Sequence, residues 1–226
     1  MNGMMDDLGV HLDNSHVSMG ADRTEYQPEE AWNFELGASF HKGGFRADAS
    51  AFYITALRQQ LTVFPPGMST GRMMTNAGKS RSYGVEAQVS YNHGGFMAHA
   101  AYGWNNARFT EYVDGDANYA GNRIPYSPAH TLFAALGYHW SKVSIQAHMR
   151  GTGPIAWNED NSLVEPFYVT LGARASVSIG RVLLYLEGEN LTNTRYKAFY
   201  FKSMGNEFFQ LGKPVSLHVG IQIRII

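Results

Sequence analysis

The sequence has 226 residues with 18 basic and 19 acidic side chains, and its net charge of -1 gives no reason to expect a nucleic-acid partner. It contains no cysteine, which excludes disulfides and thiolate metal sites. No apolar run reaches the roughly 18–20 residues that a transmembrane helix needs. We also see no signal peptide at the N-terminus, which is acidic at Asp6 and Asp7.

Alternating apolar and polar residues predict nine β-strands and no helix, because successive side chains on a strand point to opposite faces. In chain order, the predicted strands cover about residues 32–41, 45–53, 83–91, 96–105, 132–140, 143–150, 167–179, 182–189 and 215–225. The eighth is the least regular, because Leu183 and Tyr185 lie on its polar face. The ninth is the most regular and has the length of about 9–11 residues that a membrane-crossing strand needs.

The connections between these strands alternate between short and long. The short ones lie near residues 41–44, 92–95, 140–142 and 179–181, and the long ones near 61–79, 110–130, 152–165 and 190–213. Short turns on one side and long loops on the other are typical of outer-membrane barrels. The pattern therefore predicts an all-β fold, an antiparallel up-and-down transmembrane β-barrel. A soluble β-sandwich, which also alternates, is the other interpretation.

Four segments carry a resemblance to a known family. They are Tyr26–Gly37, Asn76–Glu86, Ile124–Thr131 and Glu189–Tyr196. In this order and spacing they resemble strand and loop motifs of the TonB-dependent outer-membrane receptors, and the resemblance covers about residues 26–226. It implies that residues 31–226 are part of a larger barrel. Residues 1–30 are then a loop or a weak strand, in which residues 8–19 supply a poorly patterned tenth strand.

The resemblance also implies a function, which is TonB-dependent uptake of a scarce nutrient such as a siderophore, haem, a vitamin or a glycan across the bacterial outer membrane. Family members have a plug domain and a larger barrel, so we expect the chain to be a fragment. Its expected partners are outer-membrane lipid, missing strands or a second copy, and TonB only through a plug absent from this sequence. We expect neither enzymatic activity nor a cofactor. The alternatives are a small stand-alone barrel acting as an adhesin or passive pore, and a soluble binding module.

Candidate ligand-binding residues come from the polar strand faces and the long loops. The polar faces carry Arg46, Asp48, Glu86, Gln88, His99, His148, Arg150, Arg174, His218 and Arg224. A barrel lumen is polar, so we select His148, Arg150 and Arg174 as candidates, with an internally paired charge network as the alternative. Arg123, Tyr126, Trp157 and Tyr200 in the long loops complete the set, with ordinary loop packing as the alternative.

Three further patterns are weaker. Asp114, Asp116 and Asn118 have the spacing that begins a calcium loop, but Tyr119 stands where such a loop needs glycine, which favours an acidic turn. Gly67–Gly71 fits the pattern G-x-S-x-G of hydrolases, although no helix follows it, which favours a loop. The methionines and histidines of residues 1–19 offer soft ligands for copper, but their irregular spacing favours a disordered tail.

Overall fold

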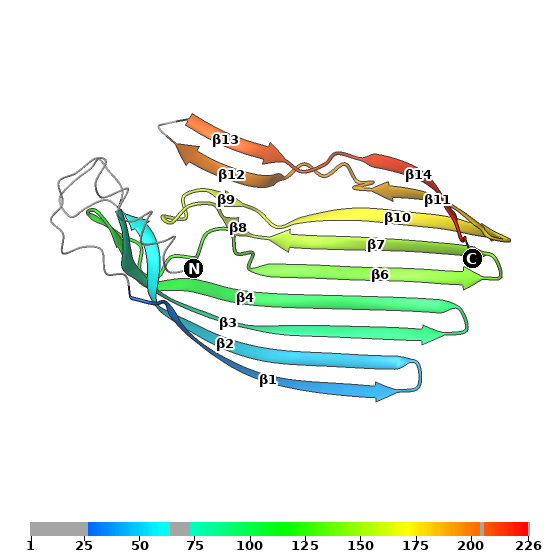
Figure 1. Ribbon diagram of the computed structural model, residues 1–226, viewed down its shortest axis with the longest axis horizontal. Coiled ribbons are helices and arrows are strands. Elements are labelled where there is room, and N and C mark those ends of the chain that lie inside the picture. The colour runs from blue at the N-terminus through cyan, green and yellow to red at the C-terminus, as the bar shows by residue number, and fades with distance from the viewer. Residues whose placement is uncertain (1–26, 64–72, 204–205, 226) are drawn as a thin grey trace. The chain divides into compact units, whose positions relative to one another are not determined.

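The computed structural model describes residues 27–63, 73–203 and 206–225 (Figure 1). Its strands are β1 (Glu30–Lys42), β2 (Phe45–Val63), β3 (Met73–His93), β4 (Phe96–Asp114), β5 (Ala117–Asn118), β6 (His130–Trp140), β7 (Val143–Gly153), β8 (Ile155–Ala156), β9 (Val164–Glu165), β10 (Tyr168–Ile179), β11 (Val182–Glu189), β12 (Lys197–Ser203), β13 (Asn206–Leu211) and β14 (Ser216–Ile223). No helix in the described residues has the length and apolar character needed to cross a membrane.

The main sheet has the strand order β1-β2-β3-β4-β6-β7-β10-β11-β14, with β5 paired to β4. Nine strands therefore follow one another as the alternation predicts, and the neighbouring pairs from β4 to β14 are antiparallel. The prediction of an all-β, up-and-down sheet is confirmed. Within the described residues the order ends at β1 and β14.

The contacts divide the chain into two compact units. The first contains, in its described part, residues 27–34, 53–63, 73–83 and 107–124, and the second contains residues 35–52, 84–106 and the described residues from 125 onward. Each unit has one small buried cluster. In the first, Phe109 and Tyr112 pack against Leu61, Tyr119 and Ile124. In the second, Ile155, Trp157 and Tyr200 pack against Leu163.

The apolar faces of the strands are exposed. On β14, Leu217 is 68% exposed, Val219 82% and Ile221 66%, and on β6 Trp140 is 72% exposed. A contiguous apolar surface of this kind marks contact with another apolar phase. It fits the lipid-facing side of a transmembrane strand, whose polar side faces the lumen.

The structure differs from the sequence predictions mainly in the long connections. β2, β3 and β4 extend into the segments predicted as loops at 61–79 and 110–130, and the segment 190–213 contains the β12–β13 hairpin. Polar side chains explain part of the extension. The Asn76 amide donates to the carbonyl oxygens of Gln27 and Arg58 at 2.8 and 2.7 Å, and the Gln60 N–H donates to the Glu29 carboxylate at 2.5 Å. Polar hydrogen bonds therefore stabilise these strand extensions, which lack the apolar alternation on which the prediction relied.

Candidate functional site

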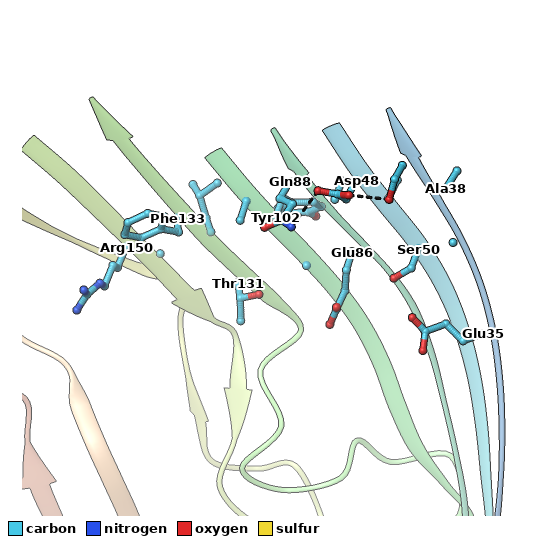
Figure 2. A pocket seen from close by; sticks show the side chains of 18 of the residues that line it. Glu35, Ala38, Asp48, Ser50, Glu86, Gln88, Tyr102, Thr131, Phe133 and Arg150 are labelled. Atoms are coloured by element: carbon cyan, nitrogen blue, oxygen red, sulfur yellow. Dashed lines mark hydrogen bonds between the residues drawn. The ribbon is translucent and has the colours of Figure 1, made fainter. Parts of the chain in front are cut away.

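A hollow of about 630 Å³ lies on the polar face of the second unit. Its lining comes from β1, β2, β3, β4, β6 and β7 (Figure 2). Figure 2 shows the carboxylates of Glu35 and Glu86 at one side and Arg150 at the other. Neither glutamate has a salt-bridge partner among the described residues. The hollow therefore offers separated charges of both signs to a polar ligand or a polar protein surface.

Asp48 in the same hollow, in contrast, accepts hydrogen bonds from several neighbouring side chains. Its carboxylate accepts hydrogen bonds from Arg46 at 2.8 and 3.1 Å, from the Ser39 hydroxyl at 2.7 Å and from the Gln88 amide at 3.2 Å. Ser39, Asp48 and Gln88 lie on β1, β2 and β3. A carboxylate with four donors links these strands, so we assign it a structural role.

His148 and Arg150 lie on this polar face beside the ring of Phe133. The ring centroid of Phe133 is 5.4 Å from that of His99 and 6.2 Å from that of His148, and the Arg150 guanidinium lies 5.8 Å from it. The imidazole of His148 on β7 reaches across β10 to the carboxylate of Glu189 on β11, at 3.4 Å. Gly172 permits this reach, because a Cβ there would lie 2.5 Å from the imidazole.

Arg174 has partners within the sheet. Its guanidinium donates to the Glu187 carboxylate at 2.9 Å and stacks over the ring of Tyr185 at 4.1 Å. The contact explains why the eighth predicted strand is irregular, because Tyr185 covers an arginine on the polar face. This arrangement corresponds to the charge-network alternative for Arg174.

The loop residues Tyr126, Trp157 and Tyr200 come together. The rings of Tyr126 and Trp157 are 5.5 Å apart, and the Tyr126 hydroxyl donates to the Tyr200 carbonyl oxygen at 3.2 Å. Trp157 is 6% exposed and Tyr200 2%, so both form the loop core, whereas Tyr126 is 48% exposed. Burial and the nearby charge of Glu159 raise the pKa of Tyr126.

Tyr126 begins a row of exposed rings that the sequence analysis missed. Its ring stacks on Phe199 at 5.6 Å, Phe199 contacts Phe201 at 5.7 Å, and Phe201 stacks on Phe208 at 4.8 Å. We call Tyr126, Phe199, Phe201 and Phe208 the aromatic row. The alternation of Phe199 and Phe201 in the segment 197–203 is the sequence signal that predicts a strand there.

Arg123 lies in the first unit, opposite Arg108 in an isolated antiparallel bridge. Asp114 and Asn118 lie at the β4–β5 turn, where Asp114 pairs with Ala117 and the Asn118 side chain accepts from the Ala120 N–H at 3.0 Å. The described residues contain no group of three or more His, Cys, Asp or Glu placed to hold a metal ion. The G-x-S-x-G pattern at Gly67–Gly71, the methionines and histidines of residues 1–19 and the tenth strand at 8–19 lie outside the described residues.

Comparison with known proteins gives consistent results. The family model described as "TonB dependent receptor-like, beta-barrel" matches residues 9–191. The pesticin receptor of Yersinia enterocolitica is 24% identical over 216 residues, which cover 91% of this chain and 30% of that receptor. The chain therefore spans about 30% of the length of this relative.

Solved structures agree on the fold. The ferric yersiniabactin uptake receptor of Yersinia pestis has a TM-score of 0.73 and 22% identity, over 85% of this chain and 29% of that one. The siderophore receptor of Acinetobacter baumannii has a TM-score of 0.73 and 19% identity, over 90% and 30% of the two chains. The ferric citrate transporter has a TM-score of 0.72 and 22% identity, over 85% and 31%. At these identities the likeness concerns the fold alone.

Proposed function

Because the chain belongs to the TonB-dependent receptor family, whose barrel model covers residues 9–191, we propose that it forms part of the wall of an outer-membrane receptor for nutrient uptake. The observation that carries the proposal is the two-sided sheet. One face holds the polar hollow of about 630 Å³, and the other exposes apolar side chains. A wall that separates lipid from a substrate passage needs both faces.

The substrate class that we propose is an iron complex. Two of the similar structures are named for ferric yersiniabactin and ferric citrate, and a third is named a siderophore receptor. In this chain the aromatic row and the mixed charges of Glu35, Glu86 and Arg150 support binding of a ligand with both flat and polar parts. Tyr126 supplies the exposed contact, while Trp157 and Tyr200 hold the loops beneath it.

The partners follow from the same proposal. The apolar strand faces contact outer-membrane lipid, and strands from the rest of the receptor or from a second copy pair with β1 and β14. An unpaired strand edge in lipid leaves each backbone polar group unsatisfied at a cost of several kcal/mol. TonB acts through the plug domain of such a receptor rather than through these strands.

The absence of cysteine makes the two faces testable with single-cysteine variants. Val85 and Glu86 are neighbours on β3 with side chains on opposite faces, and both are exposed. In outer membranes, a charged, membrane-impermeant maleimide is expected to label Glu86→Cys and to leave Val85→Cys unlabelled. Labelling of Val85→Cys alone would reverse the assignment of the faces.

The uptake function needs its own assay. In iron-starved cells that produce the receptor containing this chain, uptake of radioactive iron is measured with a panel of ferric siderophores and ferric citrate. We expect one of them to be taken up, and Tyr126→Ala with Phe199→Ala to reduce that uptake. The matched control is Phe209→Ala, on the same hairpin but outside the aromatic row. Uptake of none of these complexes, with outer-membrane insertion intact, contradicts the proposal.

A further inference from the structure

The short turns of the second unit lie side by side at one edge of the main sheet (Figure 1). They join β1 to β2, β3 to β4, β6 to β7 and β10 to β11. Backbone hydrogen bonds of 2.8–3.0 Å connect each turn to the next, and the last turn to the end of β14. From donor N–H to acceptor carbonyl, these bonds run from Asn92 to Gly44, His139 to Gly95, Ser178 to Lys142 and Arg224 to Arg181.

This edge carries positive charge without compensating acidic residues. Its exposed cations, which we call the basic edge, are Lys42, Lys142, Arg181 and Arg224. The segments 40–47, 91–96, 139–143, 178–182 and 222–225 contain no aspartate or glutamate. In the part of the chain that the structure describes, no member of the basic edge has a salt-bridge partner, whereas Arg46 nearby is paired with Asp48.

The spacing of these cations suits an extended surface. Neighbouring strands lie about 4.8 Å apart, so consecutive hairpins place their cations on the order of 10 Å apart. This separation is about one Debye length at physiological ionic strength, so the cations repel one another only weakly. The basic edge therefore presents a row of separate charges to an anionic surface rather than one compact site to a small ion.

Exposed aromatic side chains lie just inside the basic edge, on the apolar face of the sheet. Phe40 is 55% exposed, Tyr138 53% and Trp140 72%. Aromatic rings of this kind lie at the level of the headgroups in membrane proteins. Lysine and arginine beyond such a belt keep their stems on apolar surface and extend their charges outward. The order of apolar strands, aromatic belt and cations thus matches the layers of a membrane surface.

We propose that the basic edge binds the headgroups of anionic phospholipids. Ammonium and guanidinium groups donate charge-assisted hydrogen bonds to phosphate oxygens. Each lysine or arginine close to a negatively charged membrane also adds its own attraction. Short turns of outer-membrane barrels are periplasmic, so these lipids belong to the periplasmic leaflet. The inference rests on the proposed place of the sheet in the outer membrane and is independent of the substrate.

The test measures lipid preference at this edge. The full chain carries a fluorescent maleimide at Val143→Cys, beside Lys142 and paired with Trp140. It is inserted into vesicles of phosphatidylcholine and phosphatidylglycerol, in which one lipid or the other has brominated acyl chains that quench the label. The ratio of the two quenching curves gives the relative affinity of the lipids. In micelles, a parallel titration with polyglutamate tests an acidic protein as the partner instead.

Three double variants are compared with the wild type. Lys142→Gln with Arg181→Gln removes two charges from neighbouring turns of the basic edge. The matched control, Arg195→Gln with Lys213→Gln, removes two exposed charges from the connections that flank the β12–β13 hairpin. Lys142→Arg with Arg181→Lys keeps both charges.

We expect the wild type, the control and the charge-retaining variant to prefer phosphatidylglycerol at least about fivefold, and this preference to fall as salt is added. The Lys142→Gln, Arg181→Gln variant is expected to keep less than half of it. Equal quenching by the two lipids in the wild type, full preference in the Gln variant, or an equal loss in the control overturns the proposal. Binding of polyglutamate without a lipid preference assigns the edge to an acidic protein and overturns it too. Quenching by neither lipid contradicts the membrane location itself, and with it the inference.

Discussion

Asn190 fastens both ends of the connection that carries the β12–β13 hairpin. Its side-chain amide donates to the carbonyl oxygens of Thr194 at 3.0 Å and Lys213 at 2.8 Å, and its side-chain oxygen accepts from the Thr194 N–H at 2.9 Å. The residue is 5% exposed and has a positive φ of 49°. One side chain thus joins the two ends of a loop of more than twenty residues, which contains Tyr200 of the buried cluster with Trp157.

Replacing Asn190 lowers the free energy of unfolding in two ways, by the loss of its hydrogen bonds and by strain in the backbone. The Thr192 hydroxyl also donates to the Asn190 side-chain oxygen, at a longer 3.4 Å. The three shorter hydrogen bonds at about 1 kcal/mol each give a loss of roughly 3 kcal/mol in the free energy of unfolding for Asn190→Gly, which keeps the left-handed backbone. Asn190→Ala adds about 1 kcal/mol, because alanine is strained at this φ. Asn193→Ala is the matched control, with a φ of 48° but only one long bond, from the Val215 N–H at 3.3 Å.

The assay is urea unfolding in detergent micelles, followed by tryptophan fluorescence, with protease cleavage after Arg195 as a local reading of the loop. We expect Asn190→Ala to be the least stable variant and to be cleaved fastest. An Asn190→Ala variant within about 1 kcal/mol of the wild type, or no less stable than Asn193→Ala, would refute the assignment of Asn190 as the clamp.

Three further perturbations test other contacts. Trp157→Ala should lower the free energy of unfolding, measured with urea, by about 3–5 kcal/mol, because it removes a buried side chain. Trp157→Phe should lower it much less, because the buried indole Nε1 has no hydrogen-bond partner among the described residues and phenylalanine loses no such bond. Gly172→Ala should lower the free energy of unfolding by about 1–3 kcal/mol, because the added methyl group displaces the His148 imidazole. In a double-mutant cycle, the same substitution should lower it less when His148 is already alanine. The purified chain should form multimers in detergent by light scattering if β1 and β14 need partners, and a heat-resistant monomer would contradict this.

The strands of the main sheet were predictable because the two faces of a membrane strand meet different surroundings. Lipid selects apolar residues at every second position, so β14 could be read from Val215 to Ile225 without any knowledge of its neighbours. The extensions of β2 and β3 were not predictable in this way. There, Asn76 and Glu29 stabilise the strands through polar bonds to distant backbone groups, which leave no periodic signal.

The sequence singled out loop residues that lie close together in the structure, but it did not show which of them are buried and which are exposed. Long loops pointed to Tyr126, Trp157 and Tyr200, and the structure brings them together, yet burial makes two of them core residues. Arg123 was selected for its place in a loop. Its relation to Arg108 depends on a register between segments that the sequence does not encode locally.

Glycines opposite large side chains explain the remaining irregularity of the polar face. Tyr185 on β11 pairs with Gly220 on β14, and a Cβ at Gly220 would lie 2.2 Å from the Tyr185 ring, so the ring occupies the space that the glycine leaves. The same ring supports Arg174, which in turn binds Glu187. An aromatic residue on the polar face is therefore compatible with a regular strand when a glycine lies opposite it on the neighbouring strand. The pairing joins β10, β11 and β14 through one stack, and it predicts that Gly220 and Tyr185 must change together if either changes.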